Sequence, residues 1–208
     1  MTTISVSHLT KRFGPTLAVD DLSFHVRPGV VTGFPGPNGA DKSTTMRMLL
    51  GLVRPTSGDA VIGGVPYADL PDPPGTVGAL LEADAFHPAR SGRAHLEILA
   101  AASGRPRQQV DDVLARVGLV DAADRAAGGY SLGMRQRLGI AGALLADPSV
   151  LILDEPANGL DPQGVRGLRS LHGAVRAGSI TAPKHLMSAR RATQIRAHVA
   201  GLCFFGGG

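Results

Sequence analysis

The stretch that decides the fold is PSVLILDEPANGLDP, residues 148 to 162. Four apolar residues, Val150 to Leu153, stand directly before Asp154 and Glu155. A short, continuous apolar run of this kind is typical of a strand buried on both faces of a parallel sheet. Such a strand delivers both carboxylates at its carboxyl end, the edge of an α/β sheet where ligands bind. We therefore expect Asp154 to hold magnesium and Glu155 to orient or deprotonate water.

A glycine-rich loop stands upstream, GPNGADKST at residues 36 to 44. It follows the phosphate-binding pattern G-x-x-x-x-G-K-[ST] at Gly36, Lys42 and Ser43, but Asp41 replaces the second glycine. The pattern works because backbone N–H groups and a helix N-terminus converge on phosphates, while lysine adds charge and the hydroxyl binds magnesium. The predicted nucleotide-binding residues here are Gly36, Pro37, Asn38, Gly39, Ala40, Asp41, Lys42, Ser43 and Thr44, and Ser43 is also a predicted metal ligand.

The neighbourhood of this loop favours a site over a chance glycine-rich turn, the alternative that the broken pattern leaves open. The apolar residues 30–34 lead into the loop as a strand would. Behind it, Met46, Leu49, Leu50 and Val53 repeat at the spacing of one buried helix face. The sequence therefore predicts a loop between a strand and a helix, which is the setting that phosphate binding requires.

A second helix start is predicted in YSLGMRQRLGIAGALL, residues 130 to 145. Ser131 is a good N-cap, and Gly133 lets the backbone approach a ligand, so this turn is a second candidate anion site. Near the N-terminus, residues 3–9 and 22–26 alternate apolar and polar side chains, as half-buried strands do. The stretch 58–64 suggests another short strand and turn.

In this order of motifs the chain resembles the ATP-binding subunit of an ABC transporter, most of all the drug and antibiotic export branch, whose members carry SLGMRQRL. The resemblance covers residues 1 to about 165. It implies one ATP-binding domain with an α/β P-loop core and an N-terminal antiparallel β layer (residues 1–82 and 146–188) and a helical subdomain (83–145). Residues 189–208 match nothing in the family and are predicted to be an aberrant tail of the same domain.

The resemblance also implies roles for individual residues. Phe13 would stack on adenine, although a core aromatic is the alternative, and Glu82 would be a metal ligand at a position where most relatives have glutamine. His185 would sense the γ-phosphate, and Asp161 would lie in the loop between paired subunits. The signature residues would be Ser131, Leu132, Gly133 and Met134.

What the resemblance implies as a whole is an ATPase that uses ATP and Mg²⁺. Two such subunits would pair head to tail, as a homodimer or heterodimer, and drive export through a membrane permease on a separate chain. The protein would then be cytoplasmic and peripheral to the inner face of the membrane. No apolar run reaches the roughly 18 residues of a membrane span, and a single cysteine fits a reducing compartment.

Two departures support an alternative, an impaired nucleotide-binding or pairing module. At about 4 Å and an effective dielectric near 20, a like charge such as Asp41 beside a phosphate costs roughly 4 kcal/mol. A micromolar Kd corresponds to a binding free energy of about 8 kcal/mol, so this repulsion equals about half of it. Pro35 also removes an N–H at the end of the strand before the loop.

The C-terminal stretch is the other departure. All 17 acidic residues lie before residue 162, and the charge beyond it is purely basic. Pro183 suits a central strand poorly, and residues 189–208 match no expected element. We expect a disrupted or truncated reading frame, which would leave part of the sheet unmade. The basic tail also suggests a third hypothesis, a DNA-linked ATPase. The single cysteine argues against it, because one cysteine cannot form a zinc-binding cluster. We therefore expect no nucleic-acid partner.

Overall fold

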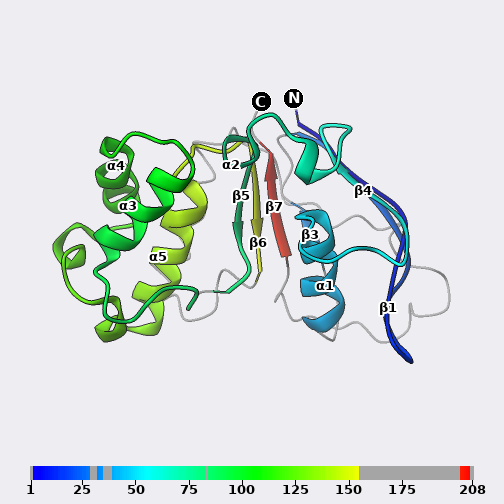
Figure 1. The fold of residues 1–208 in the computed structure, drawn as a ribbon, viewed down its shortest axis with the longest axis horizontal. Coiled ribbons are helices and arrows are strands. Elements are labelled where there is room, and N and C mark those ends of the chain that lie inside the picture. The colour runs from blue at the N-terminus through cyan, green and yellow to red at the C-terminus, as the bar shows by residue number, and fades with distance from the viewer. Residues whose placement is uncertain (1, 29–31, 35–38, 83, 155–201, 207–208) are drawn as a thin grey trace.

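The computed structural model describes residues 2–28, 32–34, 39–82, 84–154 and 202–206 (Figure 1). Among these residues, the strands are β1 (Ile4–Phe13), β2 (Thr16–Val26), β3 (Thr32–Phe34), β4 (Ser57–Ile62), β5 (Val77–Leu80), β6 (Val150–Leu153) and β7 (Leu202–Gly206). The α-helices are α1 (Gly39–Leu49), α2 (Pro73–Thr76), α3 (Gly92–Ala102), α4 (Gln108–Arg116) and α5 (Leu132–Leu144). Short 3₁₀ turns are η1 (Tyr67–Asp69), η2 (Val120–Ala122) and η3 (Ala127–Gly129).

The N-terminal strands form a three-stranded antiparallel sheet in the order β2-β1-β4. Ile4, the first residue of the central strand β1, pairs with Val26 on one side and Ile62 on the other. The alternating pattern breaks between Val6 and Leu9, where the register shifts at His8, whose φ is 50°. A bulge of this kind re-aims the following side chains, so Leu9 is buried together with Val6 although three positions separate them. The predicted antiparallel layer is confirmed.

A second sheet has the order β3-β7-β6-β5. β5 and β6 are parallel, with Val77 opposite Val150 and Leu80 opposite Leu153. All four residues of β6 are buried, which confirms the doubly covered strand predicted from VLIL. The sequence does not predict β5, because its four residues include a glycine and are too few to show a period.

The strand β7 differs from the expectation for the tail. Its backbone pairs antiparallel with β3 on one side and with β6 on the other. The prediction that the sheet is left unmade is wrong at this place, because Leu202–Gly206 fills the position between the two strands. The apolar and aromatic run LCFF has the β-propensity that such a central position favours.

The helix predicted after the glycine-rich loop is α1, and it ends earlier than the apolar spacing suggests. Met46, Leu49 and Leu50 are buried as expected. Val53 lies beyond the helix, because Gly51 adopts φ 69° and turns the chain away from the helical path. Val53 still packs against the same cluster of apolar side chains, so its contact was predicted correctly and its helical state was not.

The helices α3, α4 and α5 pack on one side of the β5–β6 pair, while α1 and the three-stranded sheet lie on the other (Figure 1). The helices α3, α4 and α5 all lie within residues 83–145, the stretch predicted to form the helical subdomain. A Cβ on Gly78 in β5 would lie 1.9 Å from the backbone oxygen of Ala143, so only glycine permits this approach of α5 to the sheet. In the described residues, no helix is both long and apolar enough to cross a bilayer.

Candidate functional site

The centre of the candidate site is a contact between the glycine-rich loop's helix and the end of β6. The hydroxyl Oγ of Ser43 donates a hydrogen bond of 2.5 Å to Oδ2 of Asp154, 111 positions away in the chain. The contact exists because α1 begins at the edge where β6 ends, and Asp154 is held there by its own N–H, which donates to the carbonyl oxygen of Leu80 over 2.8 Å. Two residues singled out from separate motifs are thus brought together.

The chemistry of this pair fits magnesium. Hydroxyl and carboxylate oxygens are ligands that Mg²⁺ prefers, and Mg²⁺ is commonly bound by one or two carboxylates together with substrate phosphates and water. Over the described part of the chain, no three His, Cys, Asp or Glu side chains gather into a metal cage. Ser43 and Asp154 are the residues that would hold a magnesium ion here, together with phosphate oxygens and water.

The first turn of α1 carries the remaining described residues of the loop. Lys42 is 5% exposed, which is unusual for a lysine and keeps its ammonium in a protected environment at the start of the helix. Thr44 is nearly buried, and Thr45 donates its hydroxyl to the carbonyl of Asp41 over 2.7 Å. The helix dipole adds partial positive charge at this end, so a phosphate at the N-terminus of α1 would meet favourable charge from the helix and from Lys42.

Asp41 lies on the exposed side of that first turn. Its carboxylate is therefore in contact with water, which screens charge more strongly than the site interior does. The repulsion of roughly 4 kcal/mol expected from the sequence is an upper bound for such a position. Whether Asp41 weakens nucleotide binding stays a prediction.

Phe13 ends β1 and is 50% exposed, so the alternative that it is a core aromatic is wrong. The ammonium of Lys11 lies 4.9 Å from the centre of its ring, a cation–π distance. An exposed aromatic face is what stacking on a base requires, and this role stays a prediction.

Glu82 follows β5, and its expected role as a metal ligand stays a prediction. Its Oε1 accepts a hydrogen bond of 2.8 Å from Nη2 of Arg47, in the last turn of α1. The structure thus ties Glu82 to an arginine rather than to the oxygen pair of Ser43 and Asp154. Arg47 is a residue that the sequence analysis missed, although its position four residues after Ser43 places both on one side of the helix.

The signature turn forms as predicted at the start of α5. Ser131 is the N-cap, and its Oγ accepts a hydrogen bond of 3.3 Å from the N–H of Met134. Leu132 is 58% exposed, and Gly133 and Met134 follow in the first turn. This turn and α1 belong to opposite sides of the β5–β6 strands (Figure 1), so the chain by itself does not gather both anion sites around one ligand.

Six predicted site residues lie outside the described residues: Gly36, Pro37, Asn38, Glu155, Asp161 and His185. For Gly39 and Ala40 the structure shows that they begin α1.

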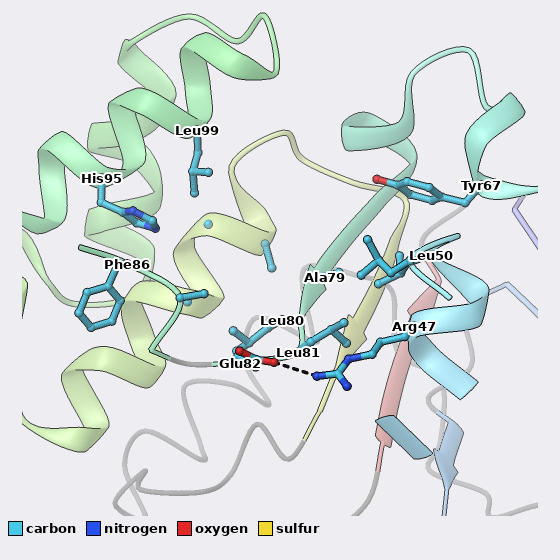
Figure 2. A pocket seen from close by; sticks show the side chains of 15 residues that line it. Arg47, Leu50, Tyr67, Ala79, Leu80, Leu81, Glu82, Phe86, His95 and Leu99 are labelled. Carbon is cyan, nitrogen blue, oxygen red and sulfur yellow. Dashed lines mark hydrogen bonds and ion pairs between the residues drawn. The ribbon is translucent and has the colours of Figure 1, made fainter. Parts of the chain in front are cut away.

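A second feature, which the sequence analysis did not find, is an apolar groove of about 520 Å³ beside Glu82 (Figure 2). Leu80 and Leu81 line the bottom of the groove in this view. His95 and Leu99 of α3 line one side, and Tyr67 lines the other. Phe86 contacts the ring of His95 edge-on, with ring centres 6.1 Å apart. Burial, and secondarily the charge of Arg90, lower the pKa of His95, which favours the neutral imidazole in this apolar setting.

Comparison with known proteins bears on the site as a whole. Residues 19–158 match the sequence profile of a family described as ABC transporter. The bacitracin transport ATP-binding protein BcrA of Bacillus licheniformis is 43% identical over 183 residues, covering 86% of this chain and 60% of BcrA. The uncharacterized ABC transporter ATP-binding protein YhcH of Bacillus subtilis (strain 168) is 43% identical over 170 residues, covering 81% of this chain and 56% of YhcH.

Among solved structures, the dimeric bacterial ABC transporter cassette MJ0796 superposes with a TM-score of 0.72 at 22% identity, covering 82% of this chain and 83% of that one. At this identity the likeness concerns the fold. The chain spans somewhat more than half the length of the two curated relatives.

Proposed function

Since the chain belongs to the ABC transporter family, we propose that it binds and hydrolyses ATP with magnesium as the ATP-binding subunit of a drug or antibiotic exporter. The observation that carries the proposal is the 2.5 Å hydrogen bond between Ser43 and Asp154, which unites the phosphate loop with the carboxylate after β6. The similarity to BcrA, a bacitracin transport ATP-binding protein, supports the class of cargo, an antibiotic such as bacitracin.

In this proposal, different residues bind the phosphates, the magnesium ion, the adenine and the attacking water. The N-terminal turn of α1 and Lys42 bind the phosphates, and Ser43 and Asp154 hold the magnesium ion. When bound, that ion neutralises charge on the phosphates and orients them for transfer. Phe13 stacks on the adenine, and Glu155 positions the attacking water, as the sequence predicts.

The exposed signature turn favours a paired arrangement. Ser131 and Leu132 present a helix N-terminus on the side of the sheet away from α1. In a head-to-tail pair, this turn would contact the nucleotide held by the other subunit. The dimeric state of the cassette MJ0796 supports such pairing.

The apolar groove is the surface that we propose for the permease. Leu52 is 65% exposed and Leu99 is 36% exposed at the groove, which is a high exposure for large apolar side chains in water. If the permease covers them, Leu52→Glu and Leu99→Glu will reduce the fraction of the protein that sediments with membranes. Val120→Glu is the matched control, because Val120 is exposed to 54% but does not line the groove.

The experiment that tests the nucleotide site is titration calorimetry with Mg-ATP on the natural chain, Ser43→Ala and Asp154→Asn. We expect binding by the natural chain and at least a tenfold loss in each variant, because each removes a metal ligand. Ser103→Ala and Asp112→Asn are matched controls, since they make the same chemical changes away from the site. Equal affinity in all five proteins would contradict the assignment.

Asp41→Gly belongs in the same titration because it tests the alternative of an impaired site. If restoring glycine raises the affinity by tenfold or more, Asp41 weakens the natural loop. If the affinity is unchanged, the exposed carboxylate is screened and the impaired reading loses its main argument.

A further inference from the structure

Two arginines, one on each nucleotide-site helix, bind the carboxylates that follow β5. The first is Arg47, which lies one helical turn beyond Ser43 on the same side of α1. Ser43 bonds to Asp154 after β6, and Arg47 bonds to Glu82 after β5. Since β5 and β6 are parallel neighbours with Leu80 opposite Leu153, the two bonds tie one face of α1 to two adjacent strand ends.

The second is Arg135, in the first turns of α5. Its Nη1 donates to Oδ1 of Asp84 over 3.4 Å. Its Nε donates to the carbonyl oxygen of Tyr130 over 3.1 Å, and its Nη2 to that of Gly128 over 3.4 Å. Gly128 and Tyr130 lie three residues and one residue before Ser131, so Arg135 joins Asp84 to the backbone that leads into the signature turn.

We propose that Arg47 and Arg135 are positioning residues, which through Glu82 and Asp84 link the phosphate-loop helix to the signature turn by charge. The proposal rests on the proposed function, because it takes Ser43 at the start of α1 and Ser131 in the signature turn as residues that contact nucleotide. It assigns Glu82 a role other than metal ligand. A displacement of α1 by a ligand at Ser43 is carried to Glu82 by Arg47, and from Asp84 to the signature turn by Arg135.

Charge is suited to this place because apolar packing is interrupted there. The side chains of α1 belong to one hydrophobic cluster and those of α5 to another. The groove of about 520 Å³ lies between them, with Arg47 and Glu82 at its edge (Figure 2). Arg47 and Glu82 thus pair at an edge that the two cores leave open.

The pairs are partly exposed, so each link is weak. Arg47 is 43% exposed and Glu82 66%, while Arg135 is 35% and Asp84 64% exposed. Exposed ion pairs shift an equilibrium by about twofold to fivefold. A weak link can break and reform during a catalytic cycle, and an effect of this size is what the test must resolve.

The test is amide hydrogen exchange on the nucleotide-free protein, comparing Arg47→Gln and Arg135→Gln with Arg107→Gln. Arg107 is the matched control because it also pairs with a carboxylate at 2.8 Å, but its partner is Glu97 in α3 and not a residue that follows β5. The amides to follow are those of Met134 and Arg135, which bond to Ser131. We expect exchange there to be about twofold to fivefold faster in Arg47→Gln and Arg135→Gln, and unchanged in Arg107→Gln.

The decisive variant is the charge swap Arg47→Glu with Glu82→Arg. If the link is ionic, the swap returns the exchange of the Met134 amide toward the natural value, whereas a role in packing alone gives no rescue. Unchanged exchange at the signature turn in Arg47→Gln, or equal acceleration in Arg107→Gln, overturns the proposal.

Repeating the exchange with Mg-ATP separates this proposal from the proposed function. If the natural chain binds Mg-ATP, we expect the ligand to protect the Met134 amide, and we expect Arg47→Gln to bind but to lose that protection. If binding occurs and the protection is the same in both proteins, the link is wrong and the proposed function stands. If the natural chain does not bind, the proposed function fails, and the nucleotide-free comparison alone decides the link.

Discussion

The two sides of the β5–β6 pair are packed in different ways. On one side, α1 and the three-stranded sheet share an apolar cluster that includes Ile4, Met46 and Ile62. On the other side, α3, α4 and α5 build a cluster rich in leucine and alanine. β6 contributes to both, because Val150 and Ile152 face one cluster while Leu151 and Leu153 face the other.

The comparison teaches where the two sides can move relative to each other. Each has its own apolar core, and they meet at short strands and at side-chain bonds near the strand ends. Three described ion pairs join one side or the other to the segments that flank β5: Arg47 with Glu82, Arg135 with Asp84, and Arg105 with Asp72. The cores therefore account for most of the stability, and the boundary contacts adjust the arrangement.

The largest loss of stability is expected in β6, the strand that contributes side chains to both clusters. Ile152 is completely buried in β6, and Ile152→Ala should lower the free energy of unfolding by about 2–5 kcal/mol. The measurement is urea denaturation followed by circular dichroism. Leu132→Ala, at a site 58% exposed, should change it by less than about 0.5 kcal/mol. Similar decreases in the free energy of unfolding in both variants would contradict the central place of β6 between the two clusters.

The next effect concerns the contact of α5 with the sheet. Gly78→Ala places a methyl group against the backbone of Ala143 and should cost about 1–3 kcal/mol, because a backbone atom cannot turn aside. Gly129→Ala is the control, since a Cβ there meets nothing within 4 Å. Thermal unfolding of both variants checks the difference. Equal melting temperatures would show that the two sides approach each other less closely than the structure has them.

A smaller effect lies inside the helical side, whose core contains a buried polar contact. The hydroxyl of Tyr130, 3% exposed, donates to the carbonyl of Ala122 over 2.6 Å. Tyr130→Phe should cost about 0.5–1.5 kcal/mol, measured by urea denaturation. Tyr67→Phe should cost less, since Tyr67 is only partly buried. A neutral Tyr130→Phe variant would mean that this core depends on apolar contacts alone.

The smallest effect is a pH dependence at the boundary. Hydrogen bonds from Arg105 and from the N–H of Gly75 lower the pKa of Asp72 below its ordinary value of 3.8. A lowered pKa stabilises the fold above the ordinary value, and this contribution disappears as the pH falls through the folded-state pKa.

Asp72→Asn should therefore lower the melting temperature slightly at pH 7, and the difference from the natural chain should shrink below pH 3.8. Asp69→Asn, a change at an exposed acid in η1, is the control. A difference that grows toward acid pH would reverse the predicted sign.

Much of the fold was predictable where one pattern dominated. The run VLIL before Asp154 could be interpreted as a buried strand because its apolar residues are continuous, and Ser131 as an N-cap because serine precedes a long helical pattern. β5 and β7 were not predicted. Four or five residues show no reliable period, and a strand partner far away in the chain leaves no local trace.

The candidate site shows the same division. Ser43 and Asp154 were recognised from their own motifs, and the structure brings them to 2.5 Å. Glu82 was assigned from its position in a motif, but the direction of its side chain depends on Arg47, which belongs to another element. The groove beside it could not be predicted, because it is a space between side chains of separate segments.

By itself, the sequence determined which chemical groups are available and which elements carry them: a hydroxyl and a lysine at the start of one helix, a carboxylate after one buried strand, and a capped turn before another helix. These follow from local patterns of a few residues. Only the tertiary structure decided which groups meet, that is, Ser43 with Asp154, Glu82 with Arg47 and Asp84 with Arg135. The physical reason is that such contacts depend on how the strands pair and how the helices pack on them, and these arrangements involve the whole chain.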